Sequence, residues 1–458
     1  MNFCILVLLI LVSTVAVYCF QLNKQHSNEE LVDIMIKIHK KCPNITTMYY
    51  LKYGDIDKTI MHNRLYVTVF GKYPTRHTAG IPEFGWISNL HGNEIIGREF
   101  SILMADYLCN KYLERDEYIT KLIYSMRIHF LSSMNPDGYL LRTDVYGFGE
   151  GHNNYFFQDL NHDFPDLGTE FFKKLEKLEH NVTDHLFTRK KFLEKKYQRE
   201  TLMTMNWLLT VPWVLQVNLH SATLVFNYGY QQSLDQYKRV YNPTPDDNIY
   251  RYIGSRFVAR HPEMKEWRVR CPTYWLYVPN ALQKGSTWLS VKNGWHDFSY
   301  LSTNLMGNNL FLSCQRNMLP ANIQFHWRTS LPSLLYYFRQ VHMGVKGVVR
   351  DEEGNRIVNA VIKTVNLTDS EPYVIMRFLR TGELGDYYRI LIPGDYAIMV
   401  SKQGYKPAIR CFKVDNLDKF SAKVIDFELP SEYYYLDPEC IRFNLDQTTV
   451  HELLEMKV

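Results

Sequence analysis

The stretch ISNLHGNEIIG, residues 87–97, joins an apolar run to a helix-prone run through a short polar turn. The apolar run leading into His91 is typical of a strand, and a helix is expected from about Glu94 to Tyr112. The turn therefore holds a histidine and a glutamate three positions apart. Both side chains are zinc ligands in proteins, so His91 and Glu94 are a candidate metal-binding pair. The spacing alone is a weak signal, because histidines in ordinary packing outnumber histidines that bind metal.

Strand and helix patterns alternate on both sides of this turn. The expected elements are a helix over 29–41, strands over 63–71 and within 126–138, a turn at 135–138, a buried strand ending at His220, a strand over 309–314 and a helix over 330–342. This order predicts an α/β domain with a mostly parallel sheet covered on both faces. Ligands of such sheets bind beyond the carboxyl ends of strands, where His91 and Glu94 fall. Catalytic zinc takes three protein ligands, and His220 is the best third candidate among the sixteen histidines.

Two regions differ from this alternation. Residues 168–199 are lysine-rich and helix-prone, which favours a solvated insertion around the glycosylation sequon at Asn181 over a docking surface. Residues 343–430 contain short alternating strands with glycine and proline at the turns, which predicts a small all-β sandwich domain. The chain is thus divided into a main domain over 21–342, the β-sandwich over 343–430 and a tail over 431–458.

The ends of the chain bear on its location. Residues 1–20 form an apolar run without an acidic residue and are predicted to be a secretory signal peptide, with an uncleaved anchor as the alternative. No second run of similar length follows, and the tail is too polar for a lipid-anchor signal, so we expect no membrane anchor. The mature protein is predicted to be secreted or to lie in the lumen of the secretory pathway.

Composition agrees with a secreted globular protein. The 458 residues are 46% hydrophobic and 22% charged, and the net charge of +4 is spread over both halves, so no nucleic-acid partner is expected. Without the two cysteines of the leader, six remain, an even number that fits disulfides in an oxidising compartment. Sequons at Asn44, Asn181 and Asn366 predict glycosylation.

Several longer blocks carry a resemblance to a known family. They are GIPEFGWISNLHGNEIIGREF, LSSMNPDGY, DLNHDFPDL, VPWVLQVNLHSATLVFNYGY, HDFSYLSTN, LSC and QVHMGVKGVV, in this order. Together they resemble the N/E branch of the zinc metallocarboxypeptidases, the group of carboxypeptidases E, N, M and D. The resemblance implies an α/β/α sandwich on a mixed sheet, followed by a transthyretin-like β-sandwich domain. It also implies one zinc ion bound by His91, Glu94 and His220, with Asp159 as the carboxylate that orients a ligand histidine.

The resemblance also shows where the substrate-binding positions have changed. The family arginine that stabilises the oxyanion is His152 in GHNN. In DLNH the amide Asn161 is kept, whereas the arginine that binds the terminal carboxylate of the substrate is His162. In NYGYQ, Gln231 replaces an acidic residue that favours basic C-termini, and His296 replaces a polar residue of the specificity pocket.

The catalytic positions have changed as well. The family tyrosine that closes over the substrate is Leu289 in TWLSV. The general-base glutamate directly before Leu-Ser-Cys is Phe311 in LFLSC, and phenylalanine cannot accept a proton at any pH. No intact catalytic residue is therefore expected.

Three hypotheses follow. The first is a pseudo-carboxypeptidase that binds zinc and a peptide C-terminus or a protein partner without cleaving it. The alternative is an active zinc peptidase with non-basic specificity that uses Asp163, His162 or a nearby carboxylate as its base. The third, a scaffold that has lost zinc, fits less well because all three ligand types are present.

Two disulfides are predicted. The end of RVRC is expected beside LSC, which pairs Cys271 with Cys314. Cys42 and Cys109 each lie near the end of a helix expected on the same sheet, which makes them the second pair.

Overall fold

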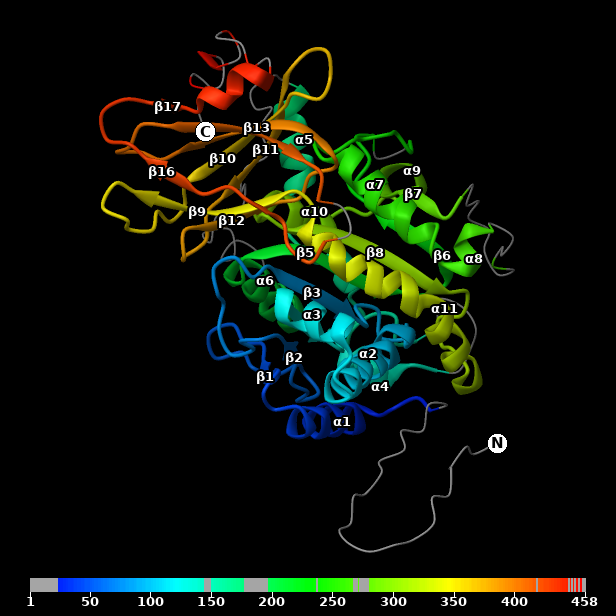
Figure 1. The fold of residues 1–458 in the computed structure, drawn as a ribbon. Helices are drawn as coiled ribbons and strands as arrows, with labels where there is room; N and C mark the ends of the chain where they lie inside the picture. Colours follow the sequence, from blue (N-terminus) through cyan, green and yellow to red (C-terminus); the bar gives the residue numbers. More distant parts are fainter. Residues whose placement is uncertain are drawn as a thin grey trace, which may run out of the picture.

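The computed structural model describes residues 24–143, 150–176, 197–235, 238–266, 271, 280–416 and 419–443, with 445, 448, 450, 451 and 454 beyond them. The predicted signal peptide, Asn181 and most of the charged insertion lie outside these residues. Figure 1 shows a large part built on one wide sheet and a smaller part made mostly of strands. Among the described residues, no helix has the length and apolar character needed to cross a membrane.

The large part contains an eight-stranded mixed sheet with the order β1-β2-β4-β3-β5-β8-β6-β7. The strands are β1 (Thr46–Tyr50), β2 (Tyr66–Phe70), β3 (Glu83–Ser88), β4 (Arg127–Leu131), β5 (Trp213–His220), β6 (Thr223–Tyr228), β7 (Leu282–Lys284) and β8 (Met306–Ser313). The central strands β4, β3, β5 and β8 run parallel, whereas β2 pairs antiparallel with β4 and β6 pairs antiparallel with β8. The carboxyl ends of β3, β5 and β8 therefore meet at one edge of the sheet.

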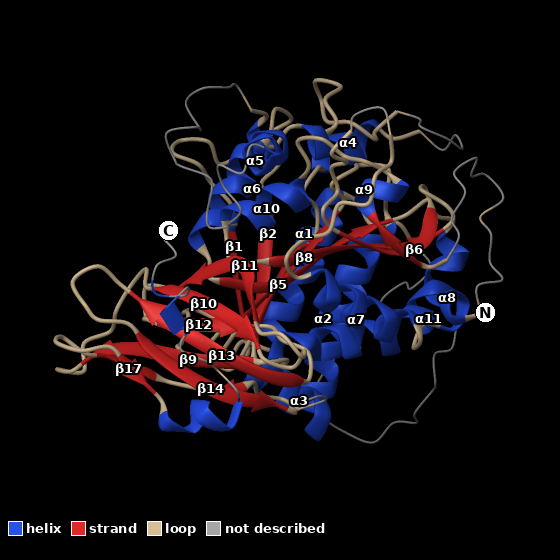
Figure 2. Ribbon diagram, turned by 90° about the horizontal axis from the view of Figure 1, so that it is seen from above, coloured by secondary structure: helices blue, strands red, loops and turns tan. Residues whose placement is uncertain are grey.

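Helices cover both faces of this sheet. They are α1 (Asn28–Lys41), α2 (Ile96–Leu113), α3 (Glu117–Ser125), α4 (Pro136–Leu141), α5 (Leu167–Glu176), α6 (Arg199–Thr210), α7 (Asp247–Val258), α8 (Pro262–Lys265), α9 (Gly285–Trp288), α10 (Trp295–Ser302) and α11 (Pro320–Arg339), with short 3-10 helices at Leu160–His162 and Gln340–His342. Figure 2 shows α5, α6 and α10 on one face and α2, α7 and α11 on the other. The expected α/β/α arrangement is confirmed.

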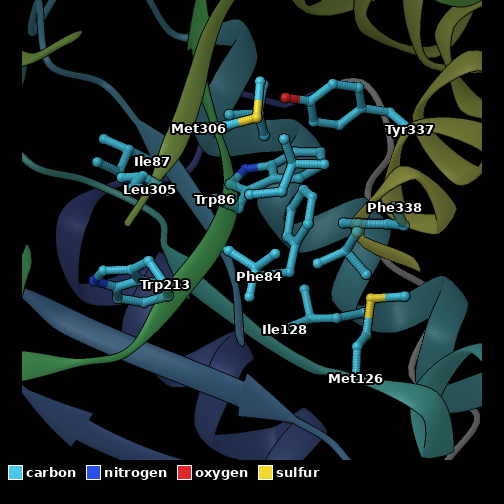
Figure 3. Packing of buried hydrophobic residues seen from close by; sticks show 14 of the residues in the cluster. Phe84, Trp86, Ile87, Met126, Ile128, Trp213, Leu305, Met306, Tyr337 and Phe338 are labelled. Atoms are coloured by element: carbon cyan, nitrogen blue, oxygen red, sulfur yellow. The ribbon is translucent and has the colours of Figure 1, made fainter. Parts of the chain in front are cut away.

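The core lies between the central strands and the helices that cover them. Phe84 and Trp86 of β3 are fully buried, and the ring of Phe338 on α11 packs 4.8 Å from Phe84 and 5.9 Å from Trp86 (Figure 3). Trp213 of β5 is buried as well. Burial of such side chains contributes about 1.5–3 kcal/mol each. This packing makes the central strands a rigid base for the residues at their carboxyl ends.

The element boundaries follow local signals. Helix α1 begins after Ser27, whose hydroxyl accepts from the Glu30 N–H while the Glu30 carboxylate accepts from the Ser27 N–H. The closing helix α11 begins at Pro320 rather than at 330, and proline at the first helical turn is typical. The predicted turn at 135–138 instead opens helix α4, because the Asn135 side chain accepts from the Gly138 N–H.

The smaller part contains two sheets. The first sheet has five strands in the order β11 (Tyr373–Arg380), β10 (Val361–Asn366), β13 (Gly394–Ser401), β14 (Ala408–Val414) and β17 (Tyr435–Leu436). The second has the order β12 (Asp386–Arg389), β9 (Val345–Asp351) and β15 (Lys423–Val424), and β16 (Phe427–Leu429) also pairs with β9. A 3-10 helix spans Pro438–Phe443. The expected all-β region follows the closing helix directly, while its transthyretin-like character stays a prediction.

Buried charges join the two parts. The Asp246 carboxylate, in front of α7, accepts from Arg377 Nη1 at 3.0 Å and from Arg389 Nη2 at 2.7 Å. It also accepts from the Tyr300 hydroxyl at 2.9 Å. Burial raises the pKa of Asp246, but the two guanidinium groups outweigh it and hold the pKa below its ordinary value.

Both predicted disulfides are confirmed. Cys42 pairs with Cys109, and Cys271 pairs with Cys314. A third disulfide, Cys411–Cys440, ties the region after β17 to β14.

The described sequons differ in accessibility. Asn44 is exposed, as a glycosylation acceptor must be. Asn366 is only 5% exposed, and its amide nitrogen donates to the Tyr373 hydroxyl at 2.9 Å. A glycan on Asn366 would have to displace this contact, so the folded chain does not present Asn366 as an acceptor.

Candidate metal centre

The turn after β3 is shaped by Asn89. This residue has a φ of 59°, a left-handed conformation that asparagine tolerates better than most residues, and its amide donates to the carbonyls of His91 at 2.9 Å and Gly92 at 2.8 Å. Gly92 meets the backbone of Gly138 so closely that an added Cβ would lie 2.3 Å from the Gly138 carbonyl carbon. The turn is therefore held by the Asn89 side chain within it and by the Gly138 backbone packed against it. These contacts position His91 and Glu94 before α2 begins.

His91, Glu94 and His220 converge at the carboxyl ends of β3 and β5. The Glu94 Oε2 atom lies 3.2 Å from His91 Nδ1 and 2.8 Å from His220 Nδ1. All three residues are at most 9% exposed. The three side chains offer ligand atoms within 4.8 Å of one another and could hold a metal ion.

The donor set fits zinc. Two imidazoles and one carboxylate form an established set, and donors on a tetrahedral zinc lie about 3.3 Å apart given the usual bond lengths. His91 Nδ1 is buried and makes no hydrogen bond within the described residues, so a cation would satisfy it. Burial alone lowers the pKa of His91, but Glu94 and Asp159 raise it to about 10. The centre is rich in negative charge and favours a cation.

Asp159 lies on the other side of His91. It caps the 3-10 helix Leu160–His162 by accepting from the Asn161 N–H, and its Oδ1 lies 3.4 Å from His91 Nε2. Burial raises the pKa of Asp159, but the charge on His91 and hydrogen bonds from His152 and His91 hold it far below its ordinary value. An ionised Asp159 is therefore placed to orient the His91 ring.

Phe311 sits beside the candidate ligands. It pairs with His220 in the parallel register of β5 and β8, and its ring stacks on the His220 ring with centroids 4.8 Å apart and an interplanar angle of 20°. The Trp288 ring meets Phe311 edge-on at 5.2 Å. This flank of the centre is therefore apolar.

A cleft of about 1540 Å³ opens over the centre. Its lining includes the predicted substrate positions His152, Asn161, His162 and Gln231, as well as Leu289 and Phe311. Its amide-bearing side chains include Asn227, whose Oδ1 accepts from the side chains of Gln231 and Asn309. The position expected to hold an acidic residue in the family thus belongs to an uncharged amide cluster.

Two predicted site residues lie outside this cleft. His296 is 1% exposed, its Nε2 donates to the Gly307 carbonyl at 2.7 Å, and an added Cβ on Gly229 would lie 2.1 Å from its ring. The His296 ring is therefore packed behind the cleft, and the expectation of substrate contact is not supported. Asp163 is 3% exposed, accepts from the Gln198 N–H at 2.7 Å and is not among the residues that line the cleft.

Two arginines of the cleft were missed in the sequence. Arg142 stacks 3.6 Å above the Tyr139 ring and donates to the Gln25 side chain at 3.1 Å. Arg316 lines the same cleft, and its carbonyl accepts from the Ile95 N–H, next to Glu94. Neither lies at a position that the motifs identify, and only the folding of separate loops onto one edge of the sheet brings them to the cleft.

Comparison with known proteins gives a consistent result. The family model described as zinc carboxypeptidase matches residues 31–332. The carboxypeptidase N catalytic chain of Rattus norvegicus is 32% identical over 394 residues, covering 84% of this chain and 82% of the relative. Carboxypeptidase E of Caenorhabditis elegans is 34% identical over 417 residues, covering 88% and 86%, and carboxypeptidase M of Mus musculus is 31% identical over 412 residues, covering 89% and 85%.

Proposed function

This chain belongs to the zinc carboxypeptidase family, and we propose that it is a catalytically impaired member that binds zinc and peptide C-termini, or a protein partner, without cleaving them. The observation that carries the proposal is Phe311, whose ring stacks on His220 where the resemblance implies a general base. His91, Glu94 and His220 would hold the zinc ion. A bound zinc ion supplies Lewis-acid polarisation of a carbonyl and lowers the pKa of a water molecule.

No carboxylate in the described part of the cleft is placed to act as the general base that Phe311 replaces. Among the described residues that line the cleft, the carboxylates are Glu94, Asp159 and Glu263. Glu94 belongs to the metal centre, Asp159 faces His91, and Glu263 lies 3.6 Å from His326. Loss of a positioned general base typically lowers a rate by about 10²- to 10⁴-fold, and loss of an oxyanion donor by about 10²- to 10³-fold. Together these losses leave little hydrolysis.

Binding of a peptide C-terminus does not require a general base or an oxyanion donor. Asn161 lines the cleft and keeps the amide that the family uses at the terminal carboxylate, and Gln231 belongs to an uncharged amide cluster. A C-terminus with a non-basic side chain fits this lining better than a lysine or arginine does. The three disulfides support a secreted or lumenal protein, because such bonds persist in oxidising compartments.

The alternative, an active peptidase with altered specificity, needs a different base. Asp163 is turned toward the Gln198 N–H and does not line the cleft, which removes the first candidate. His162 does line the cleft, but its Nδ1 is engaged by the Lys292 carbonyl at 2.8 Å and its Nε2 faces the Asp159 carboxylate at 4.0 Å. The geometry therefore favours the impaired form.

The test combines metal content, binding and hydrolysis on one sample. Zinc-loaded protein is incubated with peptides that end in Lys, Arg, Leu, Phe or Glu, and products are followed by mass spectrometry while binding is followed by fluorescence anisotropy. We expect binding without release of the terminal residue, and loss of zinc from the centre in His220→Ala but not in the control His326→Ala. Chelator-sensitive release at about 1 s⁻¹ or faster would refute the proposal, because this is the range of ordinary enzymes.

A further inference from the structure

The carboxylate of Asp159 is surrounded by imidazoles on more than one side. His91 Nε2 lies 3.4 Å from Oδ1, while His152 Nε2 lies 3.5 Å and His162 Nε2 4.0 Å from Oδ2. We propose that Asp159, His152 and His162 bind a second divalent metal ion, next to the centre formed by His91, Glu94 and His220. This site goes beyond the single zinc ion of the proposed function.

The distances are also compatible with donors that share one metal ion. The contacts of His152 and His162 to Oδ2, at 3.5 and 4.0 Å, are longer than the usual length of an N–H···O bond, about 2.7–3.2 Å, so the hydrogen bond that His152 gives to Asp159 is a long one. Donors on a tetrahedral zinc lie about 3.3 Å apart, and carboxylate and imidazole are both zinc ligands. Asp159, His152 and His91 already offer ligand atoms within 4.8 Å of one another. His162 Nε2 faces the same carboxylate oxygen of Asp159 as His152 Nε2 does.

The hydrogen bond of His162 prepares its other nitrogen for a metal. Its Nδ1 lies 2.8 Å from the Lys292 carbonyl, which can only accept, so Nδ1 carries the proton. The Nε2 atom is then the nitrogen left to face the Asp159 carboxylate, at 4.0 Å from Oδ2, and to bind a metal. Donation from the second ring nitrogen to a backbone carbonyl is also the usual arrangement of histidines that bind metal.

The two centres can coexist because Asp159 has two carboxylate oxygens. Oδ1 faces His91 Nε2 and can continue to orient that ring, while Oδ2 faces the second site. The His152 ring stacks on the His91 ring with centroids 3.9 Å apart, which holds it beside the first centre. His152, His162 and Asp159 all line the cleft, so a second ion bound by them would be accessible to a peptide in the cleft.

The site would place a positive charge where the resemblance implies two arginines. A carboxylate of a bound peptide could then be held by the second ion in place of guanidinium groups. The donor set of two imidazoles and one carboxylate suits zinc or a similar borderline divalent ion rather than magnesium or calcium, which prefer oxygen donors. Two protonated histidines paired with Asp159 would give a similar charge, and metal counting separates these two arrangements.

The experiment counts zinc in the full chain. Protein stripped with a chelator is dialysed against low micromolar free zinc, and zinc per chain is measured by inductively coupled plasma mass spectrometry. We expect two zinc ions in the wild type and one in either His152→Arg or His162→Arg. His220→Ala should lose the first ion and retain the second, and the control His326→Arg should retain both.

Titration with Co²⁺ supplies an independent readout. We expect two successive changes in the visible absorption of the wild type and a single change in His152→Arg, whose remaining ion also reports that the variant is folded. Saturation of the wild type at one ion would overturn the second site and leave the proposed function intact. A second ion that persists in both arginine variants would be adventitious and would overturn it too. Absence of any zinc in the wild type would overturn both proposals.

Discussion

His77 provides an electrostatic link between the large part and the β-sandwich. Its Nδ1 lies 2.5 Å from Glu83 Oε1 on β3, and its Nε2 lies 2.8 Å from Asp386 Oδ2 on β12. Both carboxylates are at most 2% exposed. A protonated imidazole donates to both of them, whereas a neutral one donates to only one. Burial lowers the pKa of His77, but the hydrogen bonds that its ring donates to Asp386 and Glu83 outweigh it and raise the pKa to about 9.

The size of the effect follows by linkage. A folded pKa of about 9 against an ordinary value of 6.5 corresponds to about 3 kcal/mol of stabilisation when His77 is protonated. Because the folded pKa is the higher one, this stabilisation is complete below about pH 6.5 and is lost as the pH rises through about 9. In His77→Gln the Glu83 carboxylate keeps its contact with Arg127 at 2.6 Å, so the substitution removes mainly the charge of His77.

The assay is urea unfolding followed by tryptophan fluorescence, with disulfides intact, between pH 6 and pH 10. We expect the free energy of unfolding of His77→Gln to lie about 3 kcal/mol below that of the wild type at pH 6. The difference should shrink toward zero by pH 10. Burial raises the pKa of Glu200 to about 7, but its titration is common to both proteins and cancels in the difference. His39→Gln, whose ring faces the Thr46 hydroxyl, is the matched control. A difference between wild type and His77→Gln that does not change with pH would refute the reasoning.

Two further predictions address the buried charges and the missing base. Asp246→Asn should lower the free energy of unfolding by about 3–5 kcal/mol, because Arg377 and its neighbouring guanidinium lose their buried counter-charge. A loss below about 1 kcal/mol in urea unfolding would contradict this. Phe311→Glu alone should restore little hydrolysis, whereas Phe311→Glu with His152→Arg and His162→Arg should raise kcat/KM by more than the sum of the single changes, as for groups that act together. Equal kcat/KM in the triple variant and the wild type would contradict this prediction and show that residues other than these three prevent hydrolysis.

Local patterns in the sequence were sufficient for the part of the site that lies on one turn. His91 and Glu94 are three positions apart, so the end of β3 and the start of α2 bring them together without long-range information. His220 could be added because a strand end is readable from its apolar run and its position in the order of elements. The ordered blocks then implied the family, which the comparisons confirm. Phe311 was identified in the same way, from the motif that surrounds it.

Only the tertiary structure decided which way the remaining side chains face. Asp163 lies two residues after Asn161, yet Asn161 lines the cleft while Asp163 is held by the Gln198 N–H. His296 is likewise packed behind the cleft, although its motif placed it in the pocket. The direction of a loop side chain depends on the segments that pack against it, and Gln198 is 35 residues away along the chain from Asp163. For the same reason the approach of His152 and His162 to Asp159 could not be read from spacing, since it arises where separate loops fold onto one edge of the sheet.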